Sequence, residues 1–309
     1  MQIKKIFENL RIIKNNSKLI PETLVQIKRV MYQQRKYMLQ QNIINSQEPG
    51  ITPKKYCNHN IVVSLTTFGK RIHDVAFTIE SIMEQTMKAN RIILWLDFSF
   101  ENKILPIQLE KLKDRGLEIY YCRDIRSYKK IIPTLQLCPN DAIITIDDDL
   151  LYENDIIERL INAYLTDMQY IYCSRYHEIS FDKNGILKPY CSWNWCGKNT
   201  QPSHLHFATT GAGTLFPPHC LDDEVFNEEV FKKLCFSADD VWINCMAAKK
   251  GTLIKKIETH NAKGEDYLVN EDMQDIGLFN TNISIENNND KQLKAVFEKY
   301  DIYKYIRPN

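Results

Sequence analysis

The feature that most constrains this chain is a five-residue apolar run, residues 142–146, followed at once by Asp147, Asp148 and Asp149. The run has the length and the β-branched content of a strand that is buried on both faces. The carboxyl ends of such strands form the edge where open α/β sheets bind ligands. Three adjacent carboxylates repel one another, and Mg²⁺ or Mn²⁺, which prefer oxygen ligands and accept phosphates as co-ligands, would remove that conflict. The sequence therefore indicates a metal–phosphate site, with an acidic turn before the next helix as the alternative.

The rest of the chain alternates short apolar strands with amphipathic helices. Strands are predicted over residues 61–65, 91–96, 117–121, 142–146, 170–174 and 252–257, and helices over residues 73–85, 106–114, 131–137, 154–165, 238–250 and 291–300. Such alternation predicts an α/β fold with a mostly parallel, doubly wound sheet flanked by helices. Residues 176–207 are rich in Tyr, Trp, His and Asn, and their apolar residues have little regular spacing. Ordered loops of that length usually carry function.

The first 55 residues differ from the rest in charge. They contain eight Lys, three Arg and three Glu, a net charge of +8, which leaves −7 for residues 56–309. Two helices are expected here, separated by a break at Pro21, and a linker follows near residues 50–60. We therefore expect a basic helical extension, residues 1–55, ahead of a domain over residues 56–309. The extension is either a solvated arm or a contact for an anionic membrane face or a partner, including a second copy of the chain.

Composition argues against several classes of protein. A net charge of +1 over 309 residues is not that of a dedicated nucleic-acid binder. No apolar stretch approaches the length of about eighteen residues that a membrane span needs, and residues 1–10 lack the apolar core of a signal peptide. The nine cysteines form no CxxC pair, so we interpret them as reduced thiols of a cytoplasmic protein and not as a zinc site.

Polar side chains also lie near the ends of the other predicted strands. Thr66, Thr67 and Arg71 follow the first strand, Asp97 ends the second, and Lys130 precedes the helix that leads to the acidic strand. Hydroxyls and a guanidinium suit the base and phosphates of a nucleotide, a carboxylate suits a base or ribose, and a lysine suits a diphosphate. Thr66, Thr67 and Lys130, each taken alone, are more typical of surface or capping positions. Together they predict a nucleotide site along one sheet edge.

These segments resemble bacterial glycosyltransferases of the GT-A fold, of the kind that builds capsule or the outer sugars of lipopolysaccharide. The resemblance covers roughly residues 60–300 and is carried by the stretches 62–68, 78–82, 85–86, 92–96, 127–135, 144–149, 210–218 and 238–242. It implies transfer of a sugar from a nucleoside-diphosphate sugar, with UDP favoured, to a glycan or glycolipid acceptor. It further implies a GT-A-like domain with a donor-binding half over residues 56–150 and an acceptor-binding half over residues 151–309.

The resemblance also implies a bound Mn²⁺ or Mg²⁺ and roles for particular acids. The DxD motif of such enzymes corresponds to Asp147 and Asp149, with Asp148 between them. Asp149 would bind the metal directly, and Asp147 or Asp148 would contact the ribose or the water shell of the metal. A late histidine, His260, would complete the metal shell.

Two further stretches have both a functional and a structural interpretation. The resemblance implies that Gly211 and Gly213 lie beside the donor sugar and the acceptor. The alternative is a tight turn into a strand. The second stretch, residues 176–207, is called the aromatic loop. Its rings either stack on sugars or anchor the loop to the core. Its candidate residues are Trp193, Trp195, His204 and His206.

Asp239 and Asp240 begin the helix predicted over residues 238–250. The resemblance implies that one of them, with Asp240 slightly favoured, is the general base that deprotonates the acceptor in an inverting transfer. The structural alternative is a capping box, with Ser237 as the N-cap and Asp240 at the third helical position. The helix dipole would then lower the pKa of the carboxylate and weaken it as a base.

Two other functions are compatible with acids at a sheet edge. A nucleotidyltransferase that makes sugar nucleotides usually has a Gly- and Arg-rich loop after the first strand, whereas residues 66–71 contain only Gly69. A non-catalytic glycan- or nucleotide-binding module is the other alternative, and the intact acidic motifs argue against it. We therefore expect a cytoplasmic enzyme that can also lie peripherally on the inner membrane face.

Overall fold

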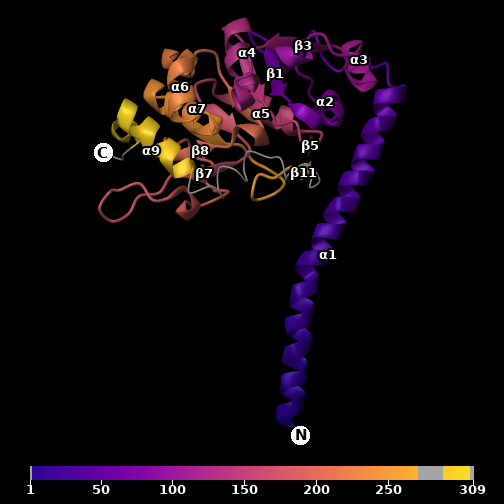
Figure 1. The fold of residues 1–309 in the computed structure, drawn as a ribbon, viewed down its shortest axis with the longest axis vertical. Helices are drawn as coiled ribbons and strands as arrows, with labels where there is room; N and C mark the ends of the chain where they lie inside the picture. The colour runs from indigo at the N-terminus through magenta and orange to yellow at the C-terminus, as the bar shows by residue number, and fades with distance from the viewer. Residues whose placement is uncertain (1, 271–287, 307–309) are drawn as a thin grey trace.

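The structure is a computed structural model that describes residues 2–270 and 288–306, with side chains from residue 23 onward. Within these residues, seven strands form a central sheet in the order β10-β6-β9-β4-β1-β2-β3. Neighbouring strands run parallel except at β9, which is antiparallel to both β4 and β6. Helices flank the sheet (Figure 1). The prediction of an α/β fold with a mostly parallel sheet is therefore confirmed.

The strands of this sheet lie close to their predicted positions, except β9, which was expected only in the alternative of a tight turn into a strand after Gly213. They are β1 (Ile61–Thr66), β2 (Arg91–Asp97), β3 (Leu117–Cys122), β4 (Ala142–Thr145), β6 (Ile171–Cys173), β9 (Thr214–Phe216) and β10 (Ile254–Lys256). Every residue of β4 is buried, as are the first five residues of β1. This is the burial expected of strands that are covered on both faces.

The helices of the domain also follow the sequence pattern. They are α2 (Val75–Met83), α3 (Ile107–Lys113), α4 (Ile132–Leu137), α5 (Ile156–Thr166), α6 (Glu228–Leu234), α7 (Asp239–Lys250), α9 (Asn288–Tyr300) and α10 (Tyr303–Ile306). One hydrophobic cluster joins α2, α3 and α5 to the sheet, and a second surrounds α7 and α9. The helices α6 and α10 were not predicted.

Two small two-stranded sheets lie outside the central one. β5 (Leu150–Tyr152) follows the three aspartates directly and pairs antiparallel with β11 (Tyr267–Val269). β7 (Tyr176–Glu178) pairs with β8 (His206–Ala208), at the two ends of the aromatic loop. The expectation that residues 176–207 have no regular structure is therefore wrong at both ends, because strands of three residues are too short to leave a period in the sequence.

The N-terminal segment is one long helix, α1 (Gln2–Asn45). The predicted break at Pro21 is wrong. The proline ring fixes φ near the helical value and costs the helix a hydrogen bond, but the backbone of α1 remains helical through this position. In the described parts of the chain, no helix is both long enough and apolar enough to cross a bilayer.

The C-terminal part of α1 packs on the domain, while its N-terminal part projects away from it (Figure 1). Tyr32, Leu39 and Ile43 are buried in the cluster that includes α2. Arg35 forms an ion pair with Glu84 at 2.6 Å. The last turns of α1 therefore belong to the core of the domain, even though they lie within the segment expected to be a separate extension.

Candidate functional site

The predicted acids gather at the carboxyl edge of the central parallel strands. Asp147 comes after β4, beside the end of β1, and the short helix η3 (Arg126–Lys130) brings Lys130 to the same edge. The N-terminus of α7 contributes two more acids. The residues that form this connected network are Arg71, Lys130, Asp147, Asp148, Asp149, Asp239 and Asp240.

Lys130 joins the acids of β4 to the acids of α7. Its Nζ donates to Oδ1 of Asp147 at 2.8 Å and lies 3.2 Å from Oδ2 of Asp239. Burial alone would lower the pKa of Lys130, but the charges of Asp147 and Asp239 raise it. Burial would likewise raise the pKa of Asp147, and Lys130 lowers it. The lysine is therefore a charged group that holds two carboxylates from distant parts of the chain.

Asp240 has a different environment from its neighbour. Its Oδ1 accepts hydrogen bonds from the backbone N–H of Thr210 at 3.0 Å and from the Thr210 hydroxyl at 2.5 Å. Burial, and next the charge of Asp239, raise the pKa of Asp240 to about 6. The pKa is thus raised, and not lowered as the helix dipole alone would predict, because burial beside another carboxylate has the larger effect.

The capping-box alternative for the start of α7 is also wrong. Ala238 occupies the N-cap position. The Ser237 hydroxyl instead donates to Oε1 of Gln292 at 3.1 Å, and the Asp240 carboxylate binds Thr210. Contacts with residues distant in the sequence have replaced the local ones that a capping box needs.

Arg71 forms a second, more buried part of the network. Its guanidinium donates to Oδ1 of Asp148 at 2.7 Å and lies 3.2 Å from Oδ2 of Asp149. The Thr67 hydroxyl donates to the other oxygen of Asp148 at 2.5 Å. The Asp148 side chain is only 6% exposed, whereas that of Asp147 is 43% exposed. Asp148 therefore faces the protein, whereas Asp147 is accessible to solvent and ligands.

The other predicted nucleotide contacts, Thr66 and Asp97, make hydrogen bonds outside the network. The Thr66 hydroxyl donates to the carbonyl of Trp95 at 2.8 Å. The Asp97 carboxylate accepts from the backbone of Ser99 at 2.9 Å and lies 4.0 Å from Nζ of Lys129. These contacts place both residues at the same edge as the acids without joining them to the network.

Gly211 is required by its close approach to Asp147. It lies in the short helix η5 (Thr210–Ala212), and its carbonyl accepts from the Asp147 amide at 3.3 Å. A Cβ at this position would lie 1.7 Å from Oδ2 of Asp147. Gly213, with φ of 99°, adopts a left-handed backbone that favours glycine as the chain turns into β9. The functional and the turn interpretations of this stretch are therefore compatible with each other.

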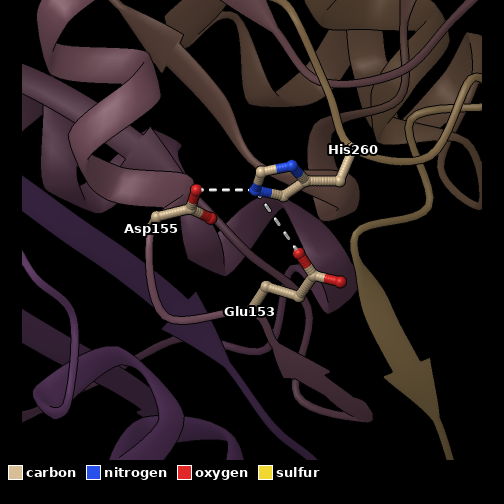
Figure 2. Close-up of side chains that lie close together, drawn as sticks. All are labelled: Glu153, Asp155 and His260. Carbon is tan, nitrogen blue, oxygen red and sulfur yellow. Dashed lines mark hydrogen bonds and ion pairs between the residues drawn. The ribbon is translucent and has the colours of Figure 1, made fainter.

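His260 lies in a separate cluster with two acidic residues, Glu153 and Asp155 (Figure 2). Its Nε2 is 2.7 Å from Oδ2 of Asp155 and 3.9 Å from Oε2 of Glu153. Arg159 also binds Asp155, at 3.0 Å. The structure thus groups His260 with acids that follow β5, and not with the predicted metal ligands Asp147 and Asp149.

Two residues at the site were missed by sequence reasoning. The Tyr152 hydroxyl accepts from the Asp147 amide at 2.9 Å and donates to the Gly211 carbonyl. Arg175 follows β6 and is held by Thr209, whose hydroxyl accepts from Nε at 2.9 Å. Its charge acts on Asp147, whose pKa it lowers. The position of a basic residue just after a predicted strand is the signal that would have found Arg175.

The aromatic loop is anchored to the core by some of its candidate rings. Trp193 is buried against Phe207, and His206 is buried and stacks on Tyr176 with ring centroids 3.8 Å apart. Trp195 is exposed and stacks on His177 at 4.7 Å. The anchoring interpretation therefore describes Trp193 and His206, whereas Trp195 is exposed and His204 is half-buried.

Comparison with known proteins gives no match, either to a protein-family model or to a curated protein. The site is an acidic edge of the sheet whose carboxylates form ion pairs with two cations, Lys130 and Arg71. Its carboxylates differ in exposure and in pKa, which allows them to have different roles.

Proposed function

We propose that this protein is a metal-dependent, inverting glycosyltransferase with a GT-A-like fold. It would move a sugar from a nucleoside-diphosphate sugar, with UDP favoured, to a glycan or glycolipid hydroxyl in the synthesis of a surface polysaccharide. The observation that carries the proposal is the network of Asp147, Lys130 and Asp239 next to Asp240. It combines an exposed carboxylate, a buried cation and a carboxyl group of raised pKa at the carboxyl edge of parallel strands.

The accessible carboxylate of Asp147 suits a hard divalent cation. Asp147 is 43% exposed, and Lys130 binds one of its two carboxylate oxygens. Asp147 and Asp149 would hold Mn²⁺ or Mg²⁺, which prefer oxygen ligands. Such an ion, when bound, stabilises the negative charge that develops on a leaving diphosphate. Lys130 and Arg71 are cations beside the same carboxylates and suit the phosphates of a donor.

Asp240 is the group best suited to act as the base. A pKa of about 6 leaves its carboxylate largely ionised at neutral pH, yet close enough to neutrality to accept a proton efficiently. Asp240 would take the proton of the acceptor hydroxyl as that oxygen bonds to the anomeric carbon, and the bond from that carbon to the diphosphate would break. Thr210 fixes the carboxylate, and Asp239 keeps Lys130 in place.

A cytoplasmic location, with peripheral contact at the inner membrane face, belongs to the same proposal. All nine cysteines are free thiols, as is usual in a reducing compartment. The basic residues of the segment 1–55 would provide the attraction to anionic lipid.

The direct test is release of nucleoside diphosphate from a panel of sugar nucleotides in the presence of Mn²⁺. We expect turnover by the natural chain and its loss in Asp149→Asn. Asp114→Asn, at an exposed acid at the end of α3, is the matched control and should keep full activity. Turnover by Asp149→Asn in excess EDTA would contradict the proposal. Pyrophosphate release from a nucleoside triphosphate and a sugar phosphate would identify a nucleotidyltransferase instead, and binding without turnover would identify a binding module.

A further inference from the structure

The α1 helix exposes a row of apolar side chains whose spacing alternates between three and four residues. Within the described side chains the row contains Leu24, Ile27, Met31 and Met38, which are 53%, 49%, 49% and 51% exposed. Gln34 occupies the remaining position between Met31 and Met38. Alternation of three and four is the heptad repeat of a coiled coil, in which positions a and d form one narrow seam.

The same register continues to the start of the sequence. The positions before Leu24 are Ile3, Ile6, Leu10, Ile13, Ser17 and Ile20. From residue 3 to residue 38, nine of the eleven a and d positions are therefore apolar, and none is charged. A repeat sustained over about five heptads exceeds the three to four that distinguish a coiled coil from a surface helix.

The domain covers a different face of α1 from the one that carries this seam. Tyr32 and Leu39 are buried against the domain, and each lies one position after a seam residue, Met31 or Met38. One position in a helix corresponds to a rotation of about 100° around its axis. A second helix can therefore pack along the seam while α1 stays docked on its own domain.

We propose that α1 joins copies of this chain in a parallel coiled coil. The basic residues of α1 stand at positions b, c, e and f, and the e positions include Lys14 and Lys28. The g positions are uncharged: they are Gln2, Asn9, Asn16, Thr23, Val30 and Tyr37. In a parallel pair, e residues face g residues of the partner, so these cations meet neutral side chains. In an antiparallel pair they would face one another and repel.

The identity of the seam residues also indicates how many chains assemble. Leu or Met occupies most of the a positions, and Ile occupies most of the d positions. Leu at a with Ile at d favours assemblies of more than two helices. The projecting part of α1 thereby gains the packing of an apolar face, from which most helical stability in proteins comes.

The test is the mass of the full chain in solution by sedimentation equilibrium at micromolar concentration. We expect more than two chains for the natural protein and a monomer for Ile27→Asp. Val25→Asp is the matched control, because Val25 is similarly exposed, at 44%, but stands at a b position. It should keep the assembly. In the assembly, Met31→Cys should cross-link to the same residue of another copy, as only a parallel arrangement allows.

Two results would overturn the proposal. One is a monomeric natural chain, or an assembly that Ile27→Asp leaves intact. The other is a monomer that binds vesicles of anionic lipid and loses that binding in Ile27→Asp, which would assign the seam to a membrane surface.

Discussion

The substitution Asp240→Asn separates a catalytic base from a structural acid, because the two roles predict opposite changes in stability. Burial and the charge of Asp239 raise the pKa of Asp240 from 3.8 to about 6. A carboxyl group whose pKa is raised by folding is unfavourable to the folded state once it ionises. The penalty is complete above about pH 6 and absent below about pH 4. Since one pKa unit corresponds to about 1.4 kcal/mol, a shift of about two units sets an upper limit of about 3 kcal/mol.

We therefore expect Asp240→Asn to raise the free energy of unfolding by about 1–2 kcal/mol at pH 7.5, with no gain at pH 4. The gain is below the limit because Asp240 keeps some contact with solvent. Asparagine can still accept the two hydrogen bonds from Thr210. Denaturant unfolding at the two pH values measures the difference, with Asp114→Asn as the control that changes neither value.

Activity should move in the opposite direction. Loss of the base predicts a fall in turnover of about 10²- to 10⁴-fold. In the natural chain, the rate should rise about tenfold between pH 5 and pH 7, since the ionised fraction of a group with a pKa of about 6 rises by that factor. If Asp240→Asn is less stable at pH 7.5 and keeps its turnover, Asp240 is a structural acid and the assignment of the base is wrong.

Three further variants test the rest of the network. Lys130→Met should lower the free energy of unfolding by about 3 kcal/mol, because it leaves the buried Asp239 carboxylate without its cation. Lys130→Met/Asp239→Asn should recover part of that loss in urea unfolding. Gly211→Ala should weaken the binding of UDP with Mn²⁺ at least about tenfold, since the added Cβ would displace the Asp147 carboxylate, and the circular dichroism spectrum should stay unchanged. Unchanged UDP affinity would argue against a role for Asp147 in binding. Asp148→Asn should lower the free energy of unfolding by about 2 kcal/mol, because it weakens two buried hydrogen bonds. Asp147→Asn, at a side chain that is 43% exposed, should lower it by less than about 1 kcal/mol. Equal losses of stability in thermal unfolding would contradict this division of roles.

The sequence predicted the parts of the fold that have a clear period. The strands β1, β2, β3 and β4 and the helices between them have apolar patterns long enough to be identified. The antiparallel direction of β9 could not be predicted, because the sequence of a three-residue strand contains no pattern that distinguishes parallel from antiparallel pairing. The continuity of α1 was missed because proline was given more weight as a helix breaker than the periodic residues on both sides of it.

The candidate site was predictable as a set of residues but not as a set of contacts. The sequence placed acids and cations at one sheet edge because parallel strands end on the same side. It could not distinguish Asp148, which binds Arg71 inside the protein, from the exposed Asp147. The bond between Asp240 and Thr210 joins residues thirty positions apart, and only the packing of α7 against η5 brings them together. The contact between His260 and Asp155 likewise depends on the pairing of β11 with β5, which the sequence did not predict.

The central claim is that Asp147 and Asp149 bind a divalent cation together with the phosphates of a nucleoside diphosphate. Isothermal titration calorimetry with Mn²⁺ and UDP tests it most directly. Two carboxylates cannot fill the six-coordinate shell of such an ion, so we expect weak binding of Mn²⁺ alone and much tighter binding of UDP when Mn²⁺ is present. The gain should disappear in Asp149→Asn and persist in Asp114→Asn. UDP affinity that is the same with Mn²⁺ and with EDTA would contradict the account.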